Sequence, residues 1–255
     1  MMRARSIGAA LAMAVMLSAG ATATSMGVEG PFYKTEGTRL GATETRLILV
    51  IAKETFRLEA TAVGLTISCT GLSLPVSGHM QIQGPATGNP GKGSGVADFT
   101  GCTQTGNGEP CEMENGLVQS VPILELLGYA GALRGGPVLV LFEPEAGRVL
   151  TTLKYVGSGC KISSQAVTGT VVALARVGGA QVQVGGGTET LHGEVTFHNR
   201  GKSIFIEKEG IIGLEIKGKM ELASVTAVLQ GTALLLAALV LSTAKADPIE
   251  WGVFS

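Results

Sequence analysis

The stretch TRLILVIAKETFRLEATAVGLTISC, residues 45–69, is rich in β-branched side chains, and its second half alternates apolar and polar residues. Alternation with a period of two indicates a strand with one buried face. Segments of the same character follow, each bounded by glycine, proline or serine, at 136–143, 148–156, 165–177, 190–198 and 202–210. Several strands at spacings of about ten residues predict an antiparallel β-sandwich or a barrel-like domain.

Few segments depart from this pattern. Only VPILELLGYAGAL (121–133) has the character of a helix of any length, so the predicted fold is all-β with at most one or two short helices. The sequence NRG between 190–198 and 202–210 is typical of a hairpin loop. GPATGNPGKGSG (84–95) is expected to be a flexible surface loop. RVGGAQVQVGGGTET (176–190) is either a linker between two domains or, as we favour, a long loop within one domain.

The first residues have the layout of a secretory leader. Two arginines precede an uncharged apolar run, which ends in the small residues ATA. This is the pattern of a signal peptide, here residues 1–23, although an uncleaved anchor is the alternative. The remainder, 24–255, is expected to be a single secreted β-rich domain whose segment 24–43 is poorly ordered. Its 17 basic and 20 acidic residues lack the electrostatic footprint of a nucleic-acid-binding protein.

Four cysteines form an even set in a chain with an export leader, where thiols oxidise. They are Cys69, Cys102, Cys111 and Cys160. In CTQTGNGEPC (102–111) a two-residue Gly-Asn turn would place Cys102 opposite Cys111, about 4.5 Å apart at Cα and within disulfide range. Pro110 lacks the N–H that this hairpin needs, so an irregular loop with the same bridge is equally compatible. We therefore predict Cys102–Cys111 and, by elimination, Cys69–Cys160, with a zinc site as the competing interpretation.

Several short motifs resemble a family of secreted, disulfide-containing, β-rich proteins of high-GC bacteria. They are ADFTGCTQTGNGEPCEMENG (97–116), LGYAGAL (127–133), GSGCKISSQAVTGTVVAL (157–174) and EWGVF (250–254). The chain departs from that family in lacking an asparagine after the last of its V-T-G strands and in its unusually apolar C-terminal segment. The family has no established activity, so the resemblance implies only a β-rich fold, export and a terminal strand in place of an anchor.

The apolar run GTALLLAALVLSTAKADPIEWGVFS (231–255) raises the question of a membrane anchor. Its strictly apolar part, 233–241, would cover only about 13 Å as a helix, less than half of the hydrocarbon thickness. We predict strand-like segments at 225–230 and 232–241, with Gln230-Gly231 resembling a turn between them, and a final strand at 249–254.

Candidate catalytic groups are few. His192 and Glu194 would share one face of a strand, where they could bind a metal or pass a proton, but we interpret both as solvated side chains. His198 would lie about 20 Å further along the same strand. Glu143 and Glu145 flank a proline in an apparent turn and are expected to be exposed acids, not a glycosidase pair.

These observations favour an exported, non-catalytic structural or binding protein of the cell envelope, cell surface or extracellular space, with no cofactor or metal. One alternative is a metal-dependent or hydrolytic secreted enzyme that uses His192 and Glu194. Another is the same domain tethered to a membrane by residues 223–244, which we do not favour. Nucleic acid is not an expected partner.

Overall fold

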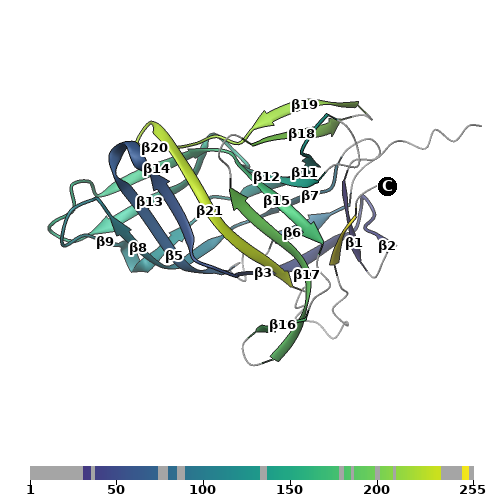
Figure 1. Ribbon diagram of the computed structural model, residues 1–255, viewed down its shortest axis with the longest axis horizontal. Helices are drawn as coiled ribbons and strands as arrows, with labels where there is room; N and C mark the ends of the chain where they lie inside the picture. Colours follow the sequence, from purple (N-terminus) through teal and green to yellow (C-terminus); the bar gives the residue numbers. More distant parts are fainter. Residues whose placement is uncertain are drawn as a thin grey trace, which may run out of the picture.

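The computed structural model describes residues 31–35, 38–73, 80–84, 90–132, 137–177, 181–184, 187–198, 202–208, 211–236 and 249–252. These residues form strands and two short 3₁₀ turns, Thr61–Val63 and Glu114–Gly116 (Figure 1). The strands are β1 Phe32–Thr35, β2 Thr38–Arg39, β3 Thr45–Ala52, β4 Phe56–Ala60, β5 Leu65–Ser73, β6 Met80–Gln83, β7 Lys92–Gly95, β8 Asp98–Thr105, β9 Glu112–Met113, β10 Leu117–Gln119, β11 Ile123–Tyr129, β12 Val138–Pro144, β13 Val149–Val156, β14 Ser164–Gly169, β15 Val171–Val177, β16 Gln181–Val184, β17 Gly187–His198, β18 Ser203–Lys208, β19 Ile211–Lys217, β20 Met220–Leu222, β21 Val225–Leu236 and β22 Ile249–Gly252.

Two circuits of antiparallel pairs hold the main sheet together. One runs β3–β6–β7–β11–β12–β15–β17–β21 and returns to β3. The other runs β4–β5–β8–β10–β13–β14–β20–β21 and returns to β4, its β10–β13 step being the single bridge Ser120–Thr151. Many neighbours in a circuit are not consecutive in the chain, because the chain passes between the two circuits, and each circuit is the ring of pairs of a sheet that curls round on itself. The predicted all-β, antiparallel, barrel-like fold is confirmed.

The inner face of the curled sheet carries the main hydrophobic core. Because alternate residues of a strand point to opposite faces, a strand with one face on this core contributes every second side chain to it. On β4, Phe56, Leu58 and Ala60 are buried, whereas Arg57 between them is exposed. The period-two pattern of the sequence therefore marks the inward positions.

A smaller core lies on the outer face of β12 and β15. There the β18–β19 hairpin supplies Ile204 and Ile206, which pack on Leu139 and Leu141 of β12 and on Val172 of β15. Figure 1 shows this hairpin lying over β11, β12 and β15. A strand covered on both faces needs apolar residues at every position, which explains the unbroken VLVLF of β12.

Two sequence predictions fail in this region. Residues 121–133 were the one stretch with the character of a helix, yet Ile123–Tyr129 is strand β11, paired with β7 and β12. Leucine favours helices intrinsically, but burial between two neighbouring strands overrides that preference. The expected surface loop 84–95 ends in strand β7, while its residues 85–89 lie outside the described part of the chain.

The stretches around the predicted linker and NRG loop also take part in strands. Residues 181–184 and the start of β17 form an antiparallel hairpin within 176–190. Residues 199–201 of the NRG loop lie outside the described residues. The pairings described for β17 are with β15, β16 and β21, and those for β18 are with β19 and β11.

The start of the C-terminal apolar run is a strand, as predicted. β21 is, however, continuous from Val225 to Leu236 and does not turn at Gln230-Gly231. Its partner changes there instead: Val228–Gln230 pair with β4, and residues 233–236 pair with β3. Residues 237–248, including the rest of the run, lie outside the described residues, and β22 forms the predicted final strand at 249–252. Among the described residues there is no helix long and apolar enough to cross a membrane.

A small second sheet stands at one end of the molecule. It has the order β2–β1–β22, so it joins the first and last strands that the structure describes (Figure 1). Its β1 and β2 fall in the segment 24–43, for which the sequence predicts poor order. Tyr33 of β1 is 1% exposed and belongs to the main core. This end of the sheet is therefore closed by a residue from the N-terminal strand.

All four cysteines form disulfides, but with other partners than predicted. Cys69 of β5 bonds Cys102 of β8, and Cys111 bonds Cys160. Cys69 and Cys102 face each other in the antiparallel register, with Cα atoms 4.0 Å apart. The predicted Cys102–Cys111 and Cys69–Cys160 pairs are thus wrong, because β8 has β5 and not its own continuation as its neighbour.

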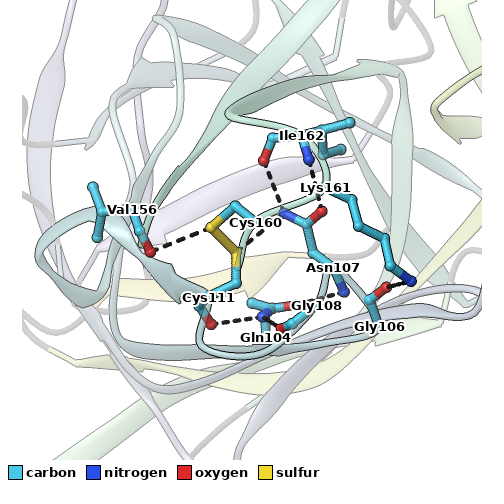
Figure 2. The surroundings of a disulfide bond; sticks show 9 residues. All are labelled: Gln104, Gly106, Asn107, Gly108, Cys111, Val156, Cys160, Lys161 and Ile162. Atoms are coloured by element: carbon cyan, nitrogen blue, oxygen red, sulfur yellow. Dashed lines mark hydrogen bonds between the residues drawn. A yellow bond between two sulfur atoms is a disulfide. The ribbon is translucent and has the colours of Figure 1, made fainter. Parts of the chain in front are cut away.

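The loop after β8 is organised by the buried side chain of Asn107 (Figure 2). Its Nδ2 donates to the carbonyl oxygen of Ile162 at 3.0 Å, and its Oδ1 accepts from the Ile162 N–H at 3.1 Å. Nδ2 also contacts Cys111 Sγ at 3.3 Å. Gln104 accepts a hydrogen bond from the Asn107 N–H at 3.0 Å and donates to the Cys111 carbonyl at 2.6 Å. The amide side chains hold the loop in place of the predicted Gly-Asn turn.

Candidate ligand-binding site

The interior of the curled sheet contains a cavity of about 130 Å³. Strands from both circuits line it, and almost all of the lining side chains are apolar. A dry, apolar cavity of about this size is large enough to hold a molecule such as benzene. The cavity is therefore a candidate site for an apolar ligand.

Four phenylalanines form one wall of this cavity. The ring of Phe56 meets Phe99 edge to face at 5.2 Å between centroids, and meets Phe197 at 5.5 Å. Phe142 stacks on Phe197 at 5.4 Å. Such offset and edge-to-face contacts fix aromatic rings in place. The wall is thus a preformed surface for a flat or short apolar ligand.

One acidic group, Glu125 of β11, lines the same cavity. Its side chain is 1% exposed, because Ile123, Glu125, Leu127 and Tyr129 all point inward from the strand. Tyr33 donates its hydroxyl hydrogen to Glu125 Oε1. The structure gives the second oxygen, Oε2, no hydrogen bond from any described residue. Within the described part of the chain, Oε2 is therefore an acceptor to which no hydrogen bond is made.

The other two polar side chains of the lining, Ser120 and Thr151, already bind the backbone. Ser120 Oγ accepts from the Ala97 N–H at 2.9 Å, and Thr151 Oγ1 donates to the Gln119 carbonyl. The Thr151 hydroxyl joins β13 to the end of β10, and the Ser120 hydroxyl joins the residue after β10 to Ala97, which precedes β8. Glu125 thus differs from them in having an oxygen, Oε2, to which no described residue donates a hydrogen bond.

Burial controls the ionisation of this pair. Removal from water raises the pKa of Glu125 from 4.5 to about 7, and the Tyr33 hydrogen bond lowers it by a smaller amount. Burial, with the nearby Glu125 carboxylate, raises the pKa of Tyr33 well above 10. A carboxyl that titrates near neutrality inside an apolar cavity is the kind of group that marks functional sites.

The residues singled out in the sequence do not gather at this cavity. Glu194 of β17 pairs with Lys53, whose Nζ lies 2.8 Å from its Oε2, and only 18% of the Glu194 side chain is exposed. The side chains of His192 and His198 lie outside the described structure. Glu143 is partly buried at the end of β12, and Glu145 is exposed beyond it. Within the described part of the chain, no three His, Cys, Asp or Glu side chains are grouped as a metal site would require.

Sequence reasoning missed both Glu125 and Tyr33. The signal for Glu125 was present as a single acid in the apolar run PILELLGY, but that run has the character of a helix in the sequence. In a strand, alternation places Glu125 on the same face as Ile123 and Leu127. Tyr33 had no comparable signal, because its burial depends on where β1 docks.

No protein-family model matches this chain, and neither the curated proteins nor the solved structures include a significant match to it.

Proposed function

We propose that this protein is an exported, non-catalytic binding protein that holds a small apolar molecule inside its curled sheet. The observation that carries the proposal is the cavity of about 130 Å³, lined by four phenylalanines and aliphatic side chains. Apolar cavities stay dry, so an apolar ligand need displace little ordered water on entering.

The cross-links support the proposed compartment. Two disulfides indicate folding in an oxidising environment, because thiols stay reduced in the cytosol. The leader-like residues 1–23 support release to the cell surface or the extracellular space. Cell fractionation and N-terminal sequencing test this part, with a mature chain beginning at Thr24 as the expected result.

Benzene is a suitable probe for the cavity. We expect saturating benzene to shift the NMR methyl signals of cavity-lining residues such as Leu58, Ile67 and Val195, while the methyls of the exposed Val156 stay unchanged. An Ala97→Leu variant should fill part of the cavity and weaken the binding at least tenfold. Ala62→Leu, an identical change at an exposed site, is the matched control. Absence of benzene binding to the folded wild-type protein would refute the proposal.

A further inference from the structure

We propose that the ligand of the cavity is a small apolar alcohol or phenol whose hydroxyl group binds Glu125 Oε2. This inference rests on the proposed function and specifies the chemistry of its ligand. Three observations lead to it: the size of the cavity, the position of Glu125 in its lining, and the oxygen of that carboxyl group to which no described residue donates a hydrogen bond.

The first step concerns the cost of the buried carboxyl. A buried acceptor without a partner loses the hydrogen bonds that water would give it, and that loss destabilises the fold. Tyr33 satisfies Oε1 only. A ligand that donates one hydrogen bond to Oε2 would satisfy this oxygen. The free energy lost by burying it would then be regained on binding.

The second step selects the donor. An ammonium group would bring a second charge into an apolar space, and desolvation of the ion would offset much of its attraction to the carboxylate. A hydroxyl group carries no charge. It can donate to Oε2 when Glu125 is ionised and accept from the carboxylic acid when Glu125 is protonated. Because the pKa of Glu125 is about 7, both forms are populated near neutral pH, and a hydroxyl suits both.

The third step sets the size of the rest of the ligand. A volume of about 130 Å³ suits one aromatic ring or a short alkyl chain, and the phenylalanine wall offers edge and face contacts to a ring. Phenol and toluene differ only in a hydroxyl replacing a methyl group, so they share a shape and isolate the contribution of Glu125.

The test compares the dissociation constants of phenol and toluene by NMR titration in the wild-type protein and in a Tyr33→Phe/Glu125→Leu double variant. Replacing both partners of the hydrogen bond avoids leaving a buried tyrosine hydroxyl unpaired, so the variant should fold. We expect the preference for phenol over toluene to fall at least tenfold in the variant, with toluene affinity retained.

Two results would overturn this inference in distinguishable ways. If toluene binds both proteins and the phenol-to-toluene preference is the same in each, Glu125 does not recognise the ligand, although the cavity binds apolar molecules as proposed. If neither compound binds the folded wild-type protein, the proposed function itself fails. Phe142→Leu, which alters the phenylalanine wall but not the carboxyl group, is the control. It should weaken the binding of phenol and of toluene by the same factor.

Discussion

Cys69 and Cys102 face each other across the β5–β8 pair, with their Cα atoms 4.0 Å apart. The side chains of both point into the main core, so this bridge ties two inner faces of neighbouring strands. The second bridge, Cys111–Cys160, instead links two loops beyond the strand ends, 49 residues apart in sequence. The two disulfides thus stabilise different parts of the same end of the molecule.

Peptide mapping without reduction should find Cys69–Cys102 and Cys111–Cys160. From the 33- and 49-residue separations, loop-closure entropy predicts that each bridge contributes about 4 kcal/mol to the free energy of unfolding. Replacing either pair by alanine should therefore lower the urea midpoint clearly. Recovery of a Cys102–Cys111 peptide from the native protein would contradict the register of β5 and β8.

Asn107 should be far more important for stability than its place in a surface loop suggests. In an Asn107→Ala variant the N–H and C=O of Ile162 would lose their partner, with a loss of about 2 to 4 kcal/mol. Gln119→Ala removes another amide, hydrogen-bonded to Asp98 at 2.8 Å, but at an exposed site. That control should change stability by less than about 1 kcal/mol. Equal losses for the two variants in urea unfolding would show that burial of Asn107 has no special role.

Glu125 should make the fold less stable as the pH rises through neutrality. Its carboxyl ionises near pH 4.5 in the unfolded chain and near pH 7 in the folded one, so the folded state holds the proton more tightly. The contribution is fully present below pH 4.5 and is lost as the pH rises to 7, a change of about 3 kcal/mol. Tyr33, the group facing it, stays neutral over this range because its pKa is raised.

Urea unfolding at pH 4 and pH 8 measures this effect. The difference in unfolding free energy between the two pH values should be smaller in Glu125→Gln than in the wild-type protein by about 3 kcal/mol. Glu145→Gln, an exposed acid next to the end of β12, is the control and should keep the wild-type pH dependence. If Glu125→Gln behaves like this control, Glu125 titrates normally in the fold.

The strands were predictable because their pattern is local. The second half of 45–69 alternates between apolar and polar residues, and that periodicity appears in the burial of β4 and β5. The C-terminal run was recognisable as strand because its apolar length is short for a membrane helix.

The disulfide pairs and the cavity depend instead on which strands become neighbours. The rule that a disulfide joins opposed residues of antiparallel strands was sound, but it was applied to 102 and 111 along the chain, whereas β8 pairs with β5. Glu125 was likewise hidden by the helix propensity of its leucines, which pairing with β7 and β12 overrides. Spacing in the sequence does not contain this long-range information.

Gly231, the single glycine of β21, should tolerate substitution poorly. Its φ of +147° is one that other residues rarely adopt, and a Cβ there would lie 2.5 Å from the ring of Phe56, a buried member of the cavity wall. Gly231 also marks the point where β21 exchanges β4 for β3 as its partner, so the backbone has little freedom to yield. We expect Gly231→Ala to destabilise the fold by about 3 kcal/mol through strain and overpacking.

Gly147→Ala separates these two causes. Gly147 also has a positive φ, +75°, but nothing lies within 4 Å of a Cβ placed there, so only conformational strain of about 1 kcal/mol should result. The contact with Phe56 is specific to Gly231. Replacing the Phe56 ring by the smaller leucine should therefore reduce the loss of stability that Gly231→Ala causes. Additive losses in this double-mutant cycle, measured by urea unfolding, would mean that Phe56 does not press on Gly231, and that β21 passes this point without being held by the cavity wall.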